Sequence, residues 1–367
     1  MEAALPAIVE DIAALVRTES PTDDLEAVAR SADVVAGLGE RRLGAAPERI
    51  TVDGCSHLRW DFGSGPRSVL LLAHHDTVWP LGSLDTHPFS VSENGILRGP
   101  GCFDMKSGLV LAFHALAALG TPDGVTLLVT GDEEIGSPTS RALIESAAAG
   151  CRAALVLEAA ADGGALKTAR KGTSLYTVTA NGKAAHSGLE PERGVNATVE
   201  LAHQIQAVAA LSSPDTGTTV TPTRLSAGTT INTVPASGSF TVDGRMWSVS
   251  EQERVDAAMR ALQPAVPGAS LSVAGGPNRP PFPASASAGL FARARALAPA
   301  LGLGTLPEAA VGGASDGNFT AGIGVPTLDG LGAVGGGAHA DSEHVVVAEL
   351  PGRAALLAAL VTDVLRN

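Results

Sequence analysis

Several histidines and acidic residues directly follow apolar stretches of the chain, where the end of a strand would present them. The sequence His74-His75-Asp76 follows the apolar run 69–73, and Glu158 follows the apolar run 153–157. Because side chains alternate between the two faces of a strand, His74 and Asp76 project to the same side. There the carboxylate can hold one imidazole nitrogen while the other nitrogen binds a metal. A satisfied polar pair is the alternative that this segment alone leaves open.

Two further acidic positions extend this pattern. Asp104 lies in a glycine-rich loop just before the apolar stretch 109–119, which has the composition of a buried helix. It is either the residue that caps this helix or a metal ligand that the loop presents. The acidic run Asp132-Glu133-Glu134 follows the apolar stretch 125–130. Adjacent carboxylates form strands poorly, but the carboxyl end of a parallel strand is where α/β folds place ligands.

Apolar segments that follow one another along the chain predict the strands and helices that must position these residues. Strands are expected at 68–73, 125–130 and 153–157, with helices at 109–119 and 140–149. Helical crossovers between successive strands indicate a mostly parallel sheet. The residues that follow each strand, together with the Asp104 loop, would then share one edge of that sheet.

The pattern changes at Thr173 and again after a proline-rich segment, 277–283, which we interpret as a hinge. Between them the order of elements is β-α-β-β-α-β, which is that of a ferredoxin-like α+β sandwich. We therefore predict an α/β catalytic domain in two parts, 1–172 and 280–367, interrupted by a smaller domain at 173–279.

Composition and charge exclude some classes of protein. The 367 residues suggest roughly two domains, and the formal net charge of −13 argues against nucleic acid as a partner. We expect no membrane partner, since no apolar run is judged long enough to cross a bilayer. The three cysteines, Cys55, Cys102 and Cys151, form no metal-binding pair motif and favour a reducing, cytoplasmic location.

A late glycine-rich loop carries His339. Its sequence Gly330-Leu-Gly332-Ala-Val-Gly335 has the letters of a dinucleotide-binding fingerprint, but no helical pattern follows, so we reject nucleotide binding. The candidates His74, His339, Asp104, Glu134 and Glu158 suit two zinc ions that share a carboxylate. Such a pair, ~3.5–4 Å apart, generates hydroxide near neutral pH and polarises an amide carbonyl. The remaining acid, Glu133, would then be the general base that carries a proton to the leaving amine.

These residues stand in motifs that resemble the dinuclear zinc peptidase and deacylase family, which includes glutamate carboxypeptidase, acetylornithine deacetylase, succinyl-diaminopimelate desuccinylase and aminoacylase. The motifs occur in order over nearly the whole chain: His74-His-Asp76-Thr, Gly-Cys-Phe-Asp104-Met-Lys-Ser-Gly, Asp-Glu133-Glu134-Ile-Gly-Ser, Glu158, Gly-Lys-Ala-Ala-His186-Ser-Gly, Asn232-Thr-Val-Pro, Asp243-Gly-Arg245 and His339. The resemblance implies two Zn²⁺ per subunit, replaceable by Co²⁺ or Mn²⁺. It implies that Asp104 bridges the ions, with His74 and Glu158 on one and Glu134 and His339 on the other. It also implies that Asp76 orients His74, that Glu133 is the base, and that a cis peptide follows Asp104.

For the inserted domain, the resemblance implies a homodimer interface and residues that contact the substrate. His186 would reach a neighbouring active site and stabilise the oxyanion. Asn232 and Arg245 are substrate-binding candidates by pattern alone, and each could instead be a turn or strand-end residue. Arg279 resembles an arginine that binds a substrate carboxylate, for which a guanidinium is well suited; a solvated hinge arginine is the alternative.

One departure from the family pattern concerns His75, at a position that is commonly apolar or small; the spacing to Asp76 favours His74 as the ligand. Glu158, where other branches have aspartate, favours the carboxypeptidase and deacylase branches. We therefore expect a carboxypeptidase-type zinc amide hydrolase that releases a C-terminal, glutamate-like amino acid from an N-acyl or peptidyl substrate. The alternative is an N-acyl-amino-acid deacylase similar to acetylornithine deacetylase. A non-catalytic binding protein is disfavoured because Glu133 and the whole ligand set are retained.

Overall fold

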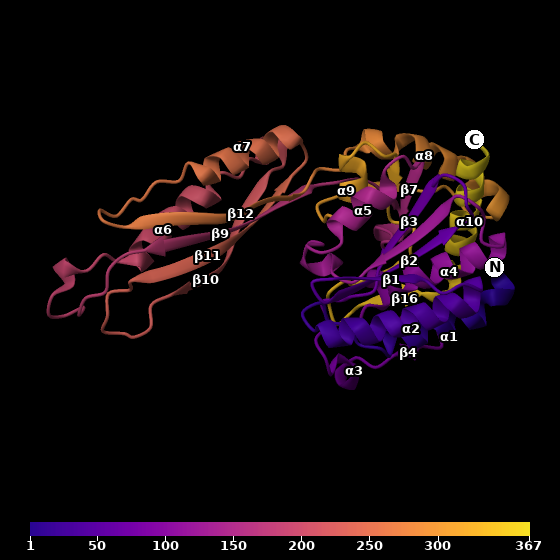
Figure 1. Ribbon diagram of the computed structural model, residues 1–367, viewed down its shortest axis with the longest axis horizontal. Coiled ribbons are helices and arrows are strands. Elements are labelled where there is room, and N and C mark those ends of the chain that lie inside the picture. Colours follow the sequence, from indigo (N-terminus) through magenta and orange to yellow (C-terminus); the bar gives the residue numbers. More distant parts are fainter. The chain divides into compact units, whose positions relative to one another are not determined.

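The computed structural model describes residues 1–367, and the chain forms two compact units (Figure 1). Unit 1 consists of Met1–Ala169, Pro283–Val311 and Ser315–Asn367, and unit 2 consists of Arg170–Phe282 and Gly312–Ala314. Unit 2 extends three residues beyond each end of the expected insertion, 173–279. It also includes the short segment 312–314, in which the carbonyl of Gly313 accepts a hydrogen bond from Nη1 of Arg170 at 3.0 Å.

Six strands form the central sheet of unit 1: β1 (Glu48–Val52), β2 (Cys55–Phe62), β3 (Val69–His74), β6 (Val125–Thr130), β7 (Ala153–Val156) and β14 (Thr327–Leu328). Their order in the sheet is β1-β2-β6-β3-β7-β14. β3 is parallel to both β6 and β7, and β14 is parallel to β7, whereas β1 and β2 add an antiparallel edge. The prediction of a mostly parallel sheet is confirmed. Strands β3, β6 and β7 are buried along their whole length, which is why their sequences are continuous apolar runs.

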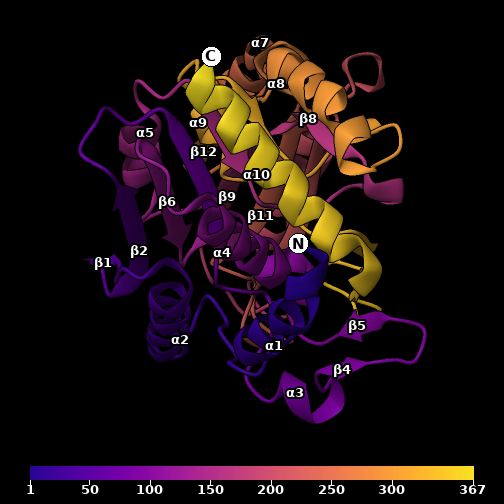
Figure 2. The ribbon, with the colours of Figure 1, turned by 90° about the vertical axis from the view of Figure 1, so that its right-hand side faces the viewer.

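Helices cover both faces of this sheet. One face packs against α1 (Leu5–Val16), α2 (Leu25–Leu43), α4 (Ser107–Leu119), α8 (Ala284–Leu297) and α10 (Leu350–Arg366). The other face packs against α5 (Arg141–Ala148) and α9 (Gly317–Gly322). Figure 2 shows α10 in the foreground with α4 beside it, and the two helices contact each other. Alternate residues of β3 point into these two apolar cores, Leu71 into the first and Leu72 into the second, so the strand is fixed from both sides.

Helix α4 corrects one expectation from the sequence. The segment Cys102–Leu119 is long and apolar enough, by length and composition, to cross a membrane, contrary to the expectation that no run qualifies. In the structure 78% of this segment is buried inside the protein, so its apolar character belongs to a core helix. The turn before it, Cys102–Lys106, contains a cis peptide bond between Asp104 and Met105, as the family resemblance implied.

Short strands outside the central sheet hold the loops that carry Asp104 and His339. They are β4 (Ser90–Val91), β5 (Ile96–Arg98), β15 (Gly335–Gly336) and β16 (His344–Val346), in the order β15-β16-β5-β4. β16 pairs with β5, so the loop that precedes β16 lies beside the loop that follows β5. Strands of two or three residues have too little alternation to be recognised in a sequence, and none of them was predicted.

Unit 2 is a two-layer sandwich of one sheet and two helices. Its elements are β9 (Gly172–Asn181), α6 (Ala197–Ala209), β10 (Thr219–Ala227), β11 (Ser237–Met246), α7 (Val249–Arg260) and β12 (Ser270–Arg279). The sheet is antiparallel with the order β10-β11-β9-β12, which is the ferredoxin-like arrangement that the sequence predicts. The interpretation of 277–283 as a hinge was partly wrong, because β12 continues to Arg279 and pairs with Thr173 there.

Candidate metal centre

The carboxyl ends of three parallel strands meet at one edge of the unit 1 sheet. His74, the last residue of β3, lies opposite Thr130 of β6, and Leu72 lies opposite Val156 of β7. The residues that follow these strands are therefore neighbours, as expected from the sequence. They are Asp76 after β3, Glu133 and Glu134 after β6, and Glu158 after β7.

His74 is the centre of this group. Its Nε2 lies 3.3 Å from a carboxylate oxygen of Asp104 and 3.5 Å from one of Glu158. The side chain is almost fully buried, and yet Nε2 has no hydrogen bond of acceptable geometry. Ligand atoms of His74, Glu133 and Glu158 lie within 4.8 Å of one another, and so do those of His74, Asp104 and Glu134.

His339 contacts Asp104 as well, through the other carboxylate oxygen, and it also contacts Glu134. Its Nε2 lies 3.2 Å from Oδ2 of Asp104 and 3.2 Å from Oε2 of Glu134. The residue has φ of 63°, a left-handed conformation that histidine adopts more readily than most residues. Asp104 thus lies between two histidines, one on each carboxylate oxygen. The structure brings together all five residues that the sequence suggested as ligands.

Asp76 supports this group through its carboxylate, in a wider role than the sequence suggested. Its Oδ2 accepts hydrogen bonds from the Thr22 hydroxyl at 2.7 Å and from the backbone N–H of Glu134 at 3.2 Å, and its Oδ1 accepts one from the N–H of Glu133 at 3.3 Å. Nδ1 of His74 lies 3.0 Å from the backbone carbonyl of Asp76 and 3.4 Å from its carboxylate. Asp76 therefore orients His74 mainly through its backbone carbonyl, which is the closer contact, and its carboxylate holds the acidic loop.

The adjacent histidine, His75, points away from this group. Its Nδ1 lies 3.1 Å from the Ser31 hydroxyl, and its Nε2 lies 3.1 Å from the Ser56 carbonyl. Burial lowers the pKa of His75 to about 4, so the ring is neutral and structural. The alternation of side chains along β3 thus separates the two histidines, with His74 among the carboxylates.

The electrostatics of the group are those of a cation site. Burial lowers the pKa of His74, but the carboxylates of Asp104, Asp76 and Glu158 overcome this and raise it well above its usual value. Hydrogen bonds to Asp104 and Glu134 raise the pKa of His339 to about 10. Burial is the main cause that raises the pKa of Glu134 to about 7, with His339 opposing and Asp104 adding to it. Without metal, protons must supply the positive charge that this many buried carboxylates require.

Two divalent ions fit the residues that are present. Imidazole and carboxylate groups are the ligands that zinc accepts in catalytic sites. Nε2 of His74 and Oε1 of Glu134 are buried atoms without a hydrogen-bond partner in the protein, which leaves both free to contact an ion. Each histidine also has carboxylate oxygens beside its Nε2, so the two imidazoles and the Asp104 carboxylate can hold ions on both sides of Asp104.

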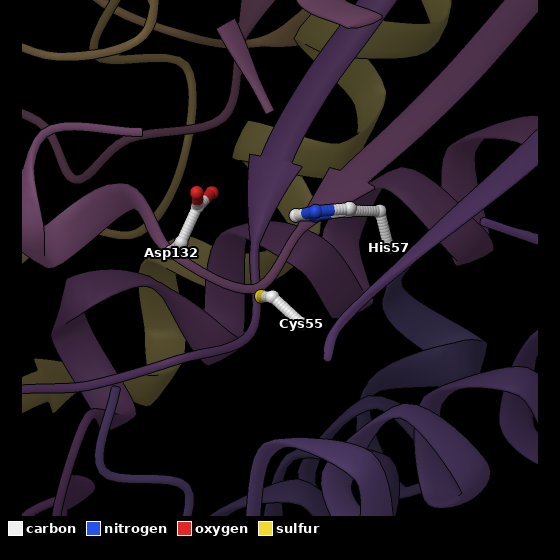
Figure 3. A group of neighbouring side chains, drawn as sticks. All are labelled: Cys55, His57 and Asp132. Carbon is white, nitrogen blue, oxygen red and sulfur yellow. The ribbon is translucent and has the colours of Figure 1, made fainter. Parts of the chain in front are cut away.

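A second group of metal-ligating residues, Cys55, His57 and Asp132, also has ligand atoms within 4.8 Å of one another (Figure 3). The hydroxyl of Thr139 lies 2.9 Å from Nε2 of His57 and donates to Asp132 at 2.7 Å, while the N–H of Gly131 donates to Nδ1 of His57 at 3.2 Å. Burial raises the pKa of the Cys55 thiol to about 12, which keeps it protonated. Both ring nitrogens of His57 are already hydrogen-bonded, and the Cys55 thiol is protonated. We therefore interpret this group as a structural one that stabilises the loop after β6.

Two supporting residues were missed in the sequence. The buried carboxylate of Glu343 accepts hydrogen bonds from three backbone N–H groups of the Asp104 loop and from the indole of Trp79. The buried guanidinium of Arg353 donates to the carbonyls of Gly164, Gly330 and Gly332, and so holds the glycine-rich loop. Neither residue belongs to a ligand motif. The only signal was that Arg353 is a charged residue beside an apolar stretch, whereas Glu343 is flanked by other polar residues and gave no signal.

The predicted substrate-binding residues belong to unit 2. His186 and Asn232 are exposed on adjacent loops, which are joined by a hydrogen bond from the N–H of Ser187 to the carbonyl of Asn232 at 3.0 Å. The guanidinium of Arg245 makes two hydrogen bonds to Asp243, at 2.6 and 2.8 Å. Arg279 ends β12 and is only 7% exposed, so the alternative of a solvated hinge arginine was wrong.

A mostly parallel sheet with helices on both faces, and a rim of imidazole and carboxylate groups at its strand ends, defines an α/β metallohydrolase. The chain belongs to peptidase family M20/M25/M40, whose family model matches residues 70–363. It is therefore a metallohydrolase that acts on amide or peptide C–N bonds.

Individual relatives extend this similarity over the whole chain. The sequence is 33% identical to carboxypeptidase G2 from Pseudomonas sp., over 98% of this chain and 89% of that protein. It is 30% identical to a succinyl-diaminopimelate desuccinylase from Dinoroseobacter shibae, over 90% of this chain and 92% of that protein. The fold is similar to that of an M20 family metallo-carboxypeptidase from Sulfolobus solfataricus, with a TM-score of 0.77, 16% identity, and coverage of 98% of this chain and 99% of that one.

Proposed function

We propose that this chain is a zinc-dependent carboxypeptidase that releases a C-terminal, glutamate-like amino acid from an N-acyl or peptidyl substrate. The observation that carries this proposal is the convergence of five metal-ligating side chains on one rim, with Glu133 beside them. The similarity to carboxypeptidase G2 over nearly the whole chain supports the carboxypeptidase form of the reaction.

Two zinc ions per subunit are the proposed cofactor, replaceable by Co²⁺ or Mn²⁺. His74 and Glu158 would hold one ion, Glu134 and His339 the other, and Asp104 would contact both. When bound, the ions supply Lewis acidity that activates water and polarises the scissile carbonyl.

Glu133 is the proposed general base. It is 8% exposed, and its ligand atoms lie within 4.8 Å of those of His74 and Glu158. The bond from its backbone N–H to Asp76 holds the start of the acidic loop in place. From this position the Glu133 carboxylate takes a proton from the attacking water and passes it to the nitrogen of the leaving amino acid.

His186 is the proposed oxyanion donor, and we place it in the active site of the neighbouring subunit of a homodimer formed through the inserted domain. Nδ1 of His186 accepts hydrogen bonds from the N–H groups of Gly188 and Leu189, both at 3.1 Å. The neutral ring therefore carries its proton on Nε2, which is the form that donates to a developing oxyanion. Asn232, on the adjoining loop, is proposed to contact the substrate from the same surface.

Arg279 is the proposed ligand for the α-carboxylate of the substrate. A guanidinium makes two parallel hydrogen bonds to a carboxylate, and a buried one excludes competing water. Arg245 is the weaker candidate for this contact, because a substrate would have to compete with Asp243 for its guanidinium.

The second candidate function is an N-acyl-amino-acid deacylase, which the similarity to a desuccinylase favours. The bond that breaks is the same in both cases, so only the preferred groups on either side of the amide separate them. The test is a comparison of kcat/KM for N-acyl glutamates and peptides with C-terminal glutamate against N-acetyl and N-succinyl derivatives of basic amino acids. We expect glutamate as the leaving residue to dominate whatever the acyl group. A strict requirement for acetyl or succinyl with a basic leaving residue would instead establish the deacylase.

A cytoplasmic location is also proposed. Cys55, Cys102 and Cys151 are all free and buried, as suits a protein that works in a reducing compartment. Fractionation of cells that express the full-length protein tests this, and recovery of activity from an oxidising compartment would contradict it.

A further inference from the structure

Glu343 is a buried carboxylate that the proposed mechanism does not use. It is 3% exposed and lies just before β16, four positions after His339. Its Oε1 accepts hydrogen bonds from the backbone N–H groups of Phe103 at 2.9 Å and Asp104 at 3.0 Å. Its Oε2 accepts from the N–H of Gly101 at 3.0 Å and from Nε1 of Trp79 at 2.7 Å.

The number of N–H donors around Glu343 matches the number of acceptor positions on its carboxylate. An ionised carboxylate has two oxygens with about four acceptor positions and no donor, and here four N–H groups converge on it. Three of these donors, the N–H groups of Gly101, Phe103 and Asp104, belong to the turn that presents Asp104, in which Asp104 and Met105 depart from helical φ and ψ. Glu343 therefore supplies the acceptors for three backbone N–H groups of this turn.

The position of Glu343 in the chain also links two candidate ligands. His339 contacts the Asp104 carboxylate through its side chain, and Glu343 contacts the Asp104 backbone. The segment between them is a compact turn, in which the N–H of Ala340 donates to Gly337 and that of Glu343 donates to Ala340. The segment 339–343 thus contacts the Asp104 turn at two points, through His339 and through Glu343. A displacement of Glu343 would therefore shift both His339 and Asp104.

We propose that Glu343 is a positioning residue for the metal centre: it fixes the Asp104 turn against the His339 loop, so that the ligands of both ions are in place before metal arrives. This inference rests on the proposed function, since it assumes that Asp104 contacts both ions. Outer groups that hold metal ligands in this way typically change metal affinity about 10- to 100-fold when they are removed.

The test compares Glu343→Gln with wild type and with a matched control, Glu200→Gln. Glu200 is fully buried in unit 2, and its carboxylate accepts N–H groups from Ala265, Val266 and Gln204 in a similar way. The Glu→Gln change at either position keeps the size of the side chain and replaces one carboxylate oxygen, an acceptor, by an NH₂ group, a donor. Both variants lose comparable internal hydrogen bonds, but only Glu343 touches the metal centre.

Metal-free protein is titrated with Co²⁺, followed by calorimetry and by the visible absorption of the bound ion. Glu343→Gln is expected to bind Co²⁺ about 10- to 100-fold more weakly and to show a changed ligand-field spectrum, because the Asp104 ligand is displaced. Glu200→Gln is expected to match wild type in both measurements. Wild-type affinity and spectrum in Glu343→Gln would overturn the proposal, as would an equal loss in both variants.

A gentler variant, Trp79→Phe, covers the outcome in which Glu343→Gln does not fold. It removes one of the four donors and leaves the three backbone bonds. We expect a weakening of Co²⁺ binding in the same direction, but smaller than about 10-fold; tighter binding or no change at all would count against the proposal. These binding measurements need no substrate, so they fail independently of the proposed carboxypeptidase activity.

Discussion

The two units hold their predicted functional residues in different ways. In unit 1, His74, Glu133 and Glu158 are buried at strand ends whose register is set by paired, fully buried strands. In unit 2, His186 and Asn232 are exposed on loops, and the bonds that hold them are mainly backbone bonds between those loops. The sheet thus fixes the positions of these three buried side chains in advance, whereas the groups proposed to contact the substrate are left accessible.

This difference separates the expected effects of substitutions. Changes on the unit 1 rim should alter metal binding or the chemical step, because its side chains contact one another. Changes in unit 2 should leave the metal centre intact and alter contacts to the transition state or to the substrate.

Glu133→Gln should lower kcat about 10²- to 10⁴-fold, because the base that accepts the proton from water is removed. Metal content should stay that of wild type, since Glu133 is not one of the proposed ligands. Steady-state kinetics and elemental analysis of the same sample check both points. Glu145→Gln, on α5 beyond the acidic loop and paired with Arg141 at the surface, is the control and should keep full activity. Retention of wild-type kcat in Glu133→Gln would remove the proposed mechanism.

His186→Ala should lower kcat about 10²- to 10³-fold with little change in KM, as expected when an oxyanion donor is lost. Because His186 is assigned to the neighbouring subunit, inactive Glu133→Gln and His186→Ala subunits should complement each other when mixed and refolded or exchanged. Half of the dimers would be mixed, each with one complete site, so recovery of about a quarter of wild-type activity is expected. No recovery in exchanged, verified dimers would place His186 outside the partner's site.

Arg279→Lys should raise KM about 10- to 100-fold for substrates with a free C-terminal carboxylate, because the two parallel hydrogen bonds cannot form. The informative control is the substrate: a C-terminally amidated analogue should be a poor substrate of wild type and should lose little further in the variant. An equal loss on both substrates would show that Arg279 supports the fold of unit 2 and does not read the carboxylate.

Asp11→Asn should leave the chemistry unchanged and reduce the stability of unit 1. Asp11 of α1 accepts hydrogen bonds from Arg42 of α2 at 2.7 and 3.0 Å and lies 2.7 Å from Nε2 of His114 of α4. Burial raises the pKa of Asp11, but these two partners overcome it and lower the pKa below its usual value. We expect the free energy of unfolding at pH 7 to fall by about 2 to 3 kcal/mol, with kcat unaffected.

The sign of the pH dependence follows from the lowered pKa. The charged form of Asp11 is favoured by folding, so its contribution is present above about pH 4 and is lost as the pH falls through the folded pKa. The stability difference between wild type and Asp11→Asn should therefore shrink in acid, as denaturant unfolding at several pH values would measure. Asp33→Asn, which breaks an exposed pair with Arg49, is the control and should change stability by less than about 0.5 kcal/mol. A difference that grows in acid would contradict the assignment.

The sequence was sufficient to predict the parallel strands and the residues that follow them. Buried strands such as β3 are continuous apolar runs, and the recurrence of polar residues at the ends of several such runs, more than any one of them, indicated a shared site. The choice of His74 over His75 depended on its two-residue spacing to Asp76, and the alternation of side chains in the structure explains why that spacing was informative. The ferredoxin-like order of unit 2 could also be predicted, because apolar residues recur with a different spacing along its strands than along its helices.

The supporting groups could not be predicted, because they act through backbone contacts between distant segments. Nothing in the sequence near Glu343 indicates that its carboxylate binds N–H groups some 240 positions earlier in the chain. Arg353 lies in the first turn of α10, just before the apolar stretch 354–361, and only the fold shows that it donates to the carbonyls of Gly330 and Gly332. Nor does a proline-rich segment show that β12 continues to Arg279, because strand pairing depends on the partner strand.

The central claim is that the unit 1 rim holds two metal ions that share Asp104. Crystals of the zinc-loaded protein, measured at the zinc absorption edge, test it most directly through anomalous scattering. The account predicts two peaks ~3.5–4 Å apart, one contacting His74 and Glu158, the other contacting Glu134 and His339, with Asp104 between them. A single peak, or a peak beside Cys55 and His57 with none at the rim, would contradict it.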